Sequence, residues 1–354
     1  MAQVPQGAIV GAQAKIIDGF LDRGHGYVVA VGEGGAQSGV YGCSGTLISR
    51  RTVVTAFHCV EPSKQAPPTH VFFGDVVSGQ GTVVPVVDPP TPPVGSPLLA
   101  IPGALVPDQA QIRIAPIEHA LYDLAFLQLA ADAPVQPATL LRETMTNDAA
   151  FVGPHMSFVG FGTSNSRPDF NGRCGTEGFG IKRAVTHPID AVGEMQDVTL
   201  FGGTLVTLPL DASLVLYQEE RIEVAPGDSG GPMFAVQGGI EHHAAVTSFG
   251  VLQCEVDQIP GAAGSGWGTE SRTDAPIIDS HVQAAIDLIE GSDAPCRSDG
   301  SCNPDCQVGQ ADLVDPDCAA QHCEADGVCA LACVAPLDPD CRKLGIDHCG
   351  TDGV

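Results

Sequence analysis

Three segments, far apart in the sequence, each hold one residue of a type used in nucleophilic catalysis. His58 lies in Thr-Ala-Phe-His-Cys, Asp123 lies in Tyr-Asp-Leu-Ala-Phe-Leu, and Ser229 lies in Gly-Asp-Ser-Gly-Gly-Pro. A serine hydroxyl is a poor nucleophile at neutral pH, so it needs a base within hydrogen-bonding reach. An imidazole base in turn needs a buried carboxylate that holds its tautomer and stabilises the imidazolium. The three residue types therefore predict a nucleophile, a base and an orienting carboxylate.

These segments resemble the His, Asp and Ser motifs of the trypsin/chymotrypsin family, and they occur in that family's order. The resemblance covers residues 16 to about 290, and the Gly-Asp-Ser-Gly-Gly-Pro motif is specific by itself. It implies peptide hydrolysis through an acyl-enzyme at Ser229, with His58 as base and Asp123 behind it. It also implies that the N–H groups of Gly227 and Ser229 bind the oxyanion, each donor contributing about 3 kcal/mol. An inactive protein of the same fold, acting as a binding protein, is the alternative.

The same resemblance implies a zymogen. In the family, cleavage before an Ile-Ile or Ile-Val start frees an amino group that pairs with the aspartate preceding the nucleophile, here Asp228. Cleavage after Lys15 would make Ile16 this new terminus. Ile9 begins a rival start further from the motifs. A buried charge pair of this kind is tolerable only when both partners are present, so losing either costs about 3–5 kcal/mol.

Primary specificity is implied by the position six residues before the nucleophile, which is Glu223. A carboxylate there would attract Arg or Lys side chains of the substrate. Gly250 and Gly266 are expected to keep the pocket open, and Ser248-Phe249-Gly250 resembles the segment along which substrate pairs as a strand. The alternatives are an exposed loop carboxylate at position 223 and a different primary specificity.

Two disulfides are expected in the catalytic region. The resemblance implies a Cys43–Cys59 pair. Ala225 stands where the family usually has a cysteine, so the disulfide that normally links the walls of the pocket is absent. Cys254 would have been the partner of that cysteine and must therefore pair elsewhere. Cys174 is the remaining unassigned cysteine of this region, so we predict a Cys174–Cys254 pair.

The composition and the pattern of short apolar runs predict an all-β fold. Gly and Pro, 43 and 28 residues, favour many turns between short strands. The family resemblance implies two six-stranded antiparallel β-barrels packed together, with the active site in the cleft between them. Asp88–Pro107 holds seven prolines and is predicted to be a surface loop, while apolar residues at helical spacing predict one helix over Ile277–Ile289. Strands are expected at Tyr27–Val31, Val71–Phe73, Thr82–Val87, Met156–Phe161, Gly180–Val185, Thr204–Leu210, Met233–Val236 and Ala244–Phe249.

The charge balance limits the partners. The chain has 42 acidic and 16 basic residues, a formal net charge of -26. Phosphate backbones and anionic membrane surfaces would repel it, so nucleic acid is not an expected partner. No apolar run approaches the roughly 18 residues of a membrane-spanning helix. The expected partners are protein or peptide substrates and an activating protease, and the expected state is a soluble monomer.

Cysteine usage predicts an oxidising compartment. Nine of the 13 cysteines follow residue 290, which fits a secreted, cell-surface or periplasmic protein better than a cytosolic one. The first residues lack the basic and apolar regions of a signal peptide. We therefore expect that a signal peptide has been removed and that Met1 is not the natural start.

Three regions are predicted: a leader at 1–15, the protease domain at 16–291, and an acidic Cys-rich tail at 292–354. The tail repeats itself from Cys296 and again from Cys323, and a third repeat begins at Cys349. It resembles short Cys-rich repeats near the C-termini of exported bacterial proteins, particularly of myxobacteria, which implies a spacer or surface-retention role. Disulfides are favoured over zinc there. The tail aspartates could bind calcium, but a solvated acidic surface is the preferred interpretation, and no cofactor is predicted.

Overall fold

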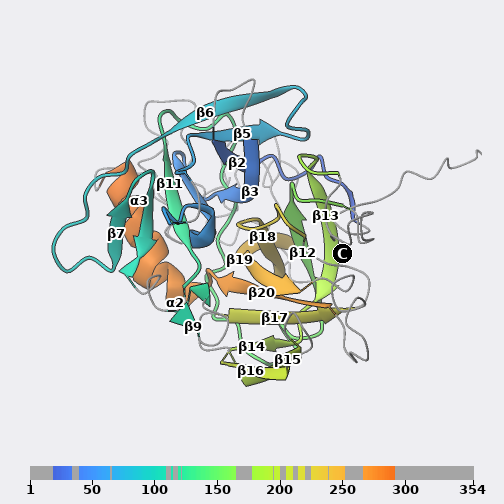
Figure 1. Cartoon of the computed structure of the whole chain (residues 1–354). Helices are drawn as coiled ribbons and strands as arrows, with labels where there is room; N and C mark the ends of the chain where they lie inside the picture. Colours follow the sequence, from blue (N-terminus) through green and yellow to red (C-terminus); the bar gives the residue numbers. More distant parts are fainter. Residues whose placement is uncertain are drawn as a thin grey trace, which may run out of the picture.

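The computed structural model describes most of the chain between residues 19 and 291. The described residues are 19–33, 40–63, 66–108, 113–114, 119–120, 122–164, 178–193, 195–199, 205–209, 214–219, 225–237, 239–251 and 266–291. They form two large antiparallel sheets, two small hairpins and a C-terminal helix (Figure 1). The predicted mostly-β fold is confirmed. Within the described residues, no helix has the length and apolar character needed to cross a membrane.

The first sheet closes into a barrel. Its strands follow the order β4-β3-β2-β5-β6-β11, and β11 pairs back with β4. Their sequences are rich in Val, Phe and Thr, whose branched or aromatic side chains pack well on a pleated surface. Val29, Val53, Val71 and Phe126 are among the residues of its apolar core. The six strands are β2 (Val28–Glu33), β3 (Val40–Leu47), β4 (Thr52–Thr55), β5 (His70–Gly74), β6 (Gly81–Val87) and β11 (Ala125–Leu129).

The stretch Asp88–Pro107, predicted as a surface loop, is a loop only over its first half. Its second half forms a hairpin of β7 (Leu98–Ile101) and β8 (Ala104–Pro107), and β8 also pairs with β11. The prediction was wrong here because the prolines of this half do not interrupt a strand. Pro102 lies in the hairpin turn and Pro107 is the last residue of β8. The four residues of β8 are all buried, which favours the hairpin over a solvated loop.

The second sheet carries the nucleophile segment and its neighbours. Its strands follow the order β1-β13-β12-β18-β19-β20-β17-β14. Met156, Phe158, Met233 and Ala245 are among the residues of its apolar core. The strands are β1 (Phe20–Leu21), β12 (His155–Gly160), β13 (Arg183–Pro188), β14 (Ala191–Val192), β17 (Leu214–Glu219), β18 (Pro232–Gln237), β19 (Ile240–Val251) and β20 (Gly266–Arg272). The small hairpins are β9 (Arg113–Ile114) with β10 (His119–Ala120), and β15 (Met195–Thr199) with β16 (Leu205–Pro209).

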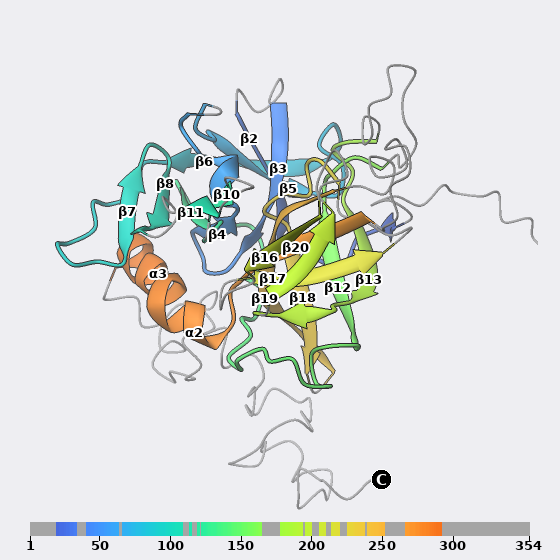
Figure 2. The ribbon, with the colours of Figure 1, turned by 60° about the horizontal axis from the view of Figure 1, so that its bottom comes forward.

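The two sheets lie side by side (Figure 2) and pack against each other through a third apolar cluster. It joins Ala30 and Phe72 of the barrel to Val159, Phe161 and Phe234 of the second sheet and its adjoining loop. The rings of Phe72 and Phe161 lie edge to face with their centroids 6.5 Å apart. This shared core fixes the two sheets relative to each other, so side chains from both can meet in one site.

The predicted C-terminal helix is present and packs on the first barrel. It runs as α2 (Ala275–Ile277), a π-helical turn η3 (Ile278–Val282) and α3 (Gln283–Glu290). Ile278, Val282 and Ile286 enter the barrel core, as their helical spacing predicts. Figure 1 shows this helix beside β7, on the side of the barrel away from the second sheet. The helix at the end of the catalytic region thus packs on the barrel formed by strands from the first half of the chain.

The segment that precedes β2 is tied to the second sheet by a charged network. His25 lies between two carboxylates, with Nδ1 2.9 Å from Asp22 and Nε2 2.6 Å from Glu241. The buried Lys182 donates a 2.8 Å hydrogen bond to the His25 backbone oxygen. Burial lowers the pKa of His25, but its bonds to Asp22 and Glu241 outweigh this and raise the pKa above its usual value. The network anchors the N-terminal segment where it crosses the second sheet.

Candidate active site

Strand pairing brings His58 and Asp123 together. β4 runs antiparallel to β11 with Thr55 opposite Ala125, so the end of β4 meets the start of β11. His58 lies in the short helix η1 (Phe57–Cys59) just after β4, and Asp123 comes just before β11. His58 Nδ1 lies 2.7 Å from Asp123 Oδ2, and the His58 backbone N–H donates a 2.9 Å hydrogen bond to Oδ1. The fully buried carboxylate therefore holds both the ring and the main chain of His58.

The bond to Asp123 also sets which nitrogen of His58 can act as a base. An ionised carboxylate only accepts hydrogen bonds, so Nδ1 must carry the hydrogen in the neutral ring. Nε2 then holds the lone pair. The His58 side chain is 21% exposed, so its ring reaches the surface of the site while the carboxylate behind it is shielded from water.

Strand β19 supplies a further donor to the same carboxylate. Ser248 Oγ donates a 2.6 Å hydrogen bond to Asp123 Oδ2, and Ser248 is buried. It lies where the β19–β20 register shifts between Thr247 and Phe249. Such irregularities re-aim side chains. Sequence reasoning placed Ser248 in the substrate-pairing segment; its bond to Asp123 was not foreseen, because it depends on this local shift.

The turn that carries Ser229 packs against the turn that carries His58. The Ser229 backbone oxygen accepts a 2.8 Å hydrogen bond from the Ser44 N–H, and Cys59 Sγ lies 3.7 Å from the same oxygen. The sulfur contact is a van der Waals contact, because Cys59 is in a disulfide and its sulfur carries no hydrogen. The structure thus brings the nucleophile segment next to the residue that follows His58.

Gly230 makes this close approach possible. Its φ is +82°, and a Cβ there would lie 2.3 Å from Ser44 O and 2.1 Å from Thr55 Oγ1. Its N–H donates a 2.8 Å hydrogen bond to Thr247 O. β19 therefore holds the nucleophile turn through Thr247 and holds Asp123 through the neighbouring Ser248. The predicted His58, Asp123 and Ser229 segments meet at one place between the two sheets.

The two amides expected to bind an oxyanion, those of Gly227 and Ser229, donate no hydrogen bond to the described residues. The intervening Asp228 N–H donates to Ala225 O at 2.9 Å. In the part of the chain that the structure describes, the N–H groups of Gly227 and Ser229 have no protein acceptor. Gly227 has a φ of +98°, which a residue with a Cβ rarely adopts. Unpaired backbone donors in a partly buried turn are suited to an incoming anionic oxygen.

Ser44 holds this turn from the barrel side. Its buried Oγ donates a 2.9 Å hydrogen bond to Gly227 O and accepts one of 2.9 Å from the Phe161 N–H. Its backbone oxygen accepts a bond of 2.7 Å from Thr55 Oγ1. These partners are up to 183 positions away in sequence. No local signal in the sequence therefore singled out Ser44 as a residue that supports the site.

The Asp228 carboxylate is almost fully buried and accepts hydrogen bonds from two backbone N–H groups. Its Oδ1 accepts a 2.7 Å hydrogen bond from Gly162 N–H, and its Oδ2 accepts one of 2.8 Å from Ala225 N–H. Burial raises the pKa of Asp228 to about 7, although these two bonds and the positive charge of Arg183 lower it. No ion pair reaches this carboxylate from the described residues, so its burial lacks a bound counter-charge.

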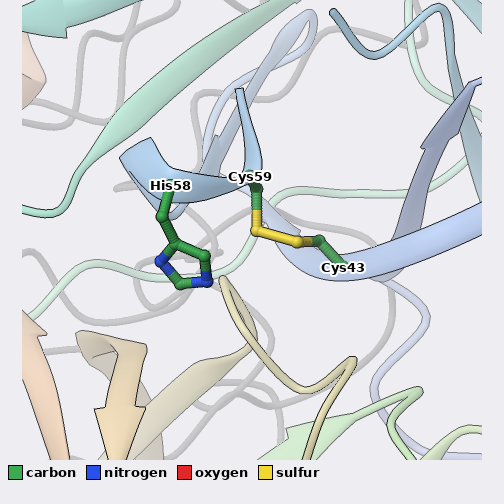
Figure 3. A group of neighbouring side chains, drawn as sticks. All are labelled: Cys43, His58 and Cys59. Carbon is green, nitrogen blue, oxygen red and sulfur yellow. A yellow bond between two sulfur atoms is a disulfide. The ribbon is translucent and has the colours of Figure 1, made fainter. Parts of the chain in front are cut away.

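The expected Cys43–Cys59 disulfide is formed beside His58 (Figure 3). Cys43, His58 and Cys59 place their donor atoms within 4.8 Å of one another. Since a disulfide sulfur is not a thiolate, this group has the donor set of a histidine next to a disulfide and not that of a metal site. A hollow of about 190 Å³ lies beside the disulfide and is lined by both cysteines and by residues that include Val31, Gly42 and Pro68.

The segment expected to bind substrate has an exposed Gly250 at its end. The structure pairs Gly250 with Gly268, whereas Gly266 lies opposite Glu219 at the start of β20. Phe249 is half-buried and accepts a 3.0 Å hydrogen bond from Thr269 Oγ1 at its backbone oxygen. Gly268 is therefore the cross-strand neighbour of Gly250, whereas Gly266, which the sequence analysis named with Gly250 as a residue that keeps the pocket open, pairs with Glu219.

Several predicted residues lie outside the described part of the chain. They are Lys15 and Ile16 of the activation site, the rival start Ile9, the specificity residue Glu223, the cysteines Cys174 and Cys254, and the whole tail at 292–354.

A comparison with protein families agrees with this architecture. Residues 22–177 match the family model described as Trypsin. The match includes His58 and Asp123. The Ser229 segment comes after the matched residues and leads into β18 of the second sheet. No curated protein matched the chain. The matched segment and the two-sheet fold support a trypsin/chymotrypsin-like fold for the catalytic region of this chain.

Proposed function

We propose that the chain is a secreted serine endopeptidase that cleaves after Arg or Lys through an acyl-enzyme at Ser229. The observation that carries this proposal is the buried Asp123 carboxylate, 2.7 Å from His58 Nδ1, with the Ser229 turn packed against the same site. A structural role alone would not require an imidazole, a carboxylate and a glycine-framed serine at one junction between two sheets.

The proposed reaction has two halves. In the first, Ser229 Oγ attacks the carbonyl carbon of the scissile bond while its proton passes to His58 Nε2. The carbonyl oxygen becomes negative and is held by the N–H groups of Gly227 and Ser229. The intermediate then collapses, the amine leaves with the proton from His58, and an ester to Ser229 remains. In the second half, water attacks the ester by the same proton path and releases the carboxylic acid.

The proposal includes activation by cleavage after Lys15. Asp228 supports it, because this buried carboxylate has a raised pKa and no ion pair from the described residues. An α-amino group delivered to it by a new terminus at Ile16 would supply the missing counter-charge. A separate protease would perform the cleavage.

The remaining parts of the proposal concern substrate and location. The Arg or Lys preference rests on the acidic character expected of the pocket, for which the sequence offers Glu223. The Cys43–Cys59 disulfide fits an oxidising compartment, and we propose that the protein is exported and acts as a monomer without a metal cofactor.

A peptide library tests the activity and its specificity together. The full chain, treated by limited proteolysis, is expected to cleave peptides after Arg or Lys, and Ser229→Ala and His58→Ala are expected to lose turnover by at least about a thousandfold. N-terminal sequencing of the active species is expected to begin at Ile16. Turnover that survives in Ser229→Ala would rule out the mechanism, and cleavage after other residues would rule out the specificity.

A further inference from the structure

Strand β20 holds a buried carboxylate to which the proposed chemistry gives no role. Glu270 is fully buried, and neither oxygen has a hydrogen-bond partner among the described residues. Burial raises the pKa of Glu270 well above its ordinary value; the Thr247 hydroxyl counters this slightly, and the nearby Asp228 adds to it. A buried carboxylate without a partner is unfavourable, and such groups are normally paired with a cation or bound to a ligand.

The buried cations of the described residues are engaged elsewhere. Arg272 pairs with Asp274, and Lys182 lies 3.2 Å from Asp75. Arg183 donates to two backbone carbonyls at 3.0 and 3.1 Å. None of the three is bonded to Glu270, so these cations of the described residues leave its carboxyl group without a counter-charge.

Glu270 lies close behind the nucleophile turn. Its direct neighbour across the strand pair is Thr247. The Thr247 backbone is bonded to Gly230 and Gly231, both at 2.8 Å. Since adjacent strands lie about 4.8 Å apart, the Glu270 backbone is about 10 Å from the residues that follow Ser229. A long basic side chain and a glutamate side chain together can span such a gap.

Two glycines lie next to Glu270 on the β19–β20 strand pair. Gly268 lies two residues before Glu270 and therefore on the same face of β20. Its partner on β19 is Gly250, which is exposed. Neither residue has a side chain, so neither places side-chain atoms over the face of β20 on which Glu270 lies.

We propose that the Glu270 carboxylate binds the basic side chain of the substrate residue whose carbonyl Ser229 attacks. This inference rests on the proposed peptidase function and names the group that selects its substrate. An entering guanidinium or ammonium supplies the missing partner and gains charge-assisted hydrogen bonds in a site shielded from water. Glu270 thereby takes the role for which the sequence alone suggested Glu223.

Substrate selectivity tests the assignment. The full-length enzyme, after the limited proteolysis that gives maximal labelling by a fluorophosphonate, is assayed on peptide p-nitroanilides that differ only in Arg, Lys or Leu before the scissile bond. In Glu270→Gln, kcat/KM for the Arg and Lys substrates is expected to fall by about 100-fold. The value for Leu and the fluorophosphonate labelling of Ser229 are expected to be retained. Glu143→Gln, which neutralises an exposed carboxylate, is the matched control.

The outcomes separate this inference from the proposed function. An unchanged ratio of Arg to Leu turnover in Glu270→Gln overturns the inference, as does a change of that ratio in Glu223→Gln alone. Absence of both labelling and turnover in the wild-type enzyme overturns the proposed function instead. If Glu270→Gln does not fold, Glu270→Asp is the second variant. It keeps the carboxylate but shortens the side chain by one methylene group. An unchanged preference between Arg and Lys substrates in Glu270→Asp also overturns the inference.

Discussion

Asp123 is the residue on which the geometry of the site depends. Two bonds from His58 and one from Ser248 surround its buried carboxylate, and the ring of His58 takes its orientation from them. Hydrogen bonds to a carboxylate favour its charged form, which is the form that stabilises an imidazolium. Small changes to this arrangement should therefore act on the chemical step more than on substrate binding.

Ser248→Ala tests that expectation. A hydrogen bond to a charged acceptor contributes about 1.5–3 kcal/mol, and Ser248→Ala removes one such bond from Asp123. We therefore expect kcat to fall about 10- to 100-fold with little change in KM. Ser271→Ala, on the adjacent strand, is the control, since the buried Ser271 hydroxyl has no hydrogen-bond partner among the described residues. Steady-state kinetics of both variants measure the two values of kcat. An equal fall in kcat in Ser248→Ala and Ser271→Ala would show that Ser248 acts only through packing.

Ser44→Ala tests the support of the oxyanion amides. The change removes the bond to Gly227 O and leaves Phe161 N–H without its acceptor. We expect kcat to fall about tenfold or more and a peptide boronic acid, which resembles the tetrahedral intermediate, to bind correspondingly more weakly.

Thr46→Val provides a matched control for Ser44→Ala. Thr46 is also a buried residue of β3, but its hydroxyl has no hydrogen-bond partner among the described residues. Unaltered boronic acid affinity in Ser44→Ala would contradict the supporting role of Ser44.

At the scale of elements, the antiparallel pairing of β4 and β11 converts two distant motifs into one site. That outcome could be predicted from the sequence, because apolar strands flank His58 and Asp123 and the motif order resembles a known family. The hairpin β7–β8 could not, because the number of prolines in Asp88–Pro107 hid the fact that none falls inside a paired strand interior.

Other parts of the site could not be predicted from the sequence, for a related reason. The roles of Ser44 and Ser248 depend on bonds between segments that are distant in sequence and on a register shift in β19. The choice of Gly268 over Gly266 as the neighbour of Gly250 depends on strand register as well. Register follows from packing of whole strands, and a local pattern does not determine it.

The C-terminal helix is predicted to be essential to the first barrel. Ile286 is buried in the barrel core, so Ile286→Ala should lower the free energy of unfolding by about 2–5 kcal/mol. Gln283→Ala, at a half-buried position of the same helix, should change it by less than about 1 kcal/mol. Urea denaturation of the two variants in a Ser229→Ala background, which prevents self-cleavage, provides the comparison. Similar losses in both would place the helix outside the cooperative core.

At the scale of the whole molecule, the proposed activation links cleavage to pH-dependent stability. In the uncleaved chain the pKa of Asp228 is about 7, above its ordinary 3.8. The folded state then keeps this proton to higher pH than the unfolded state. The Asp228 contribution to the free energy of unfolding therefore falls as pH rises from about 4 to 7 and is constant above 7. After cleavage, an ion pair with the new amino group would lower that pKa and remove the loss.

Denaturation of the Ser229→Ala protein between pH 4 and pH 8, before and after cleavage at Lys15, measures this difference. We expect stability to fall more steeply with rising pH in the uncleaved form, and Asp228→Asn to remove the difference between the two forms. Other titrating groups contribute to both forms alike, so they do not affect the comparison. Identical pH profiles for the two forms would contradict the proposed pairing of Asp228 with Ile16.

The most direct test of the account is covalent labelling by a fluorophosphonate, followed by mass spectrometry of the labelled peptide. This reagent reacts with a serine only when a base activates the hydroxyl and donors stabilise the oxyanion. The account predicts a single label on Ser229 in the cleaved wild-type protein, and no label in His58→Ala or Ser229→Ala proteins that keep their near-ultraviolet circular dichroism. A label on another residue, or labelling that persists in Ser229→Ala, would contradict it.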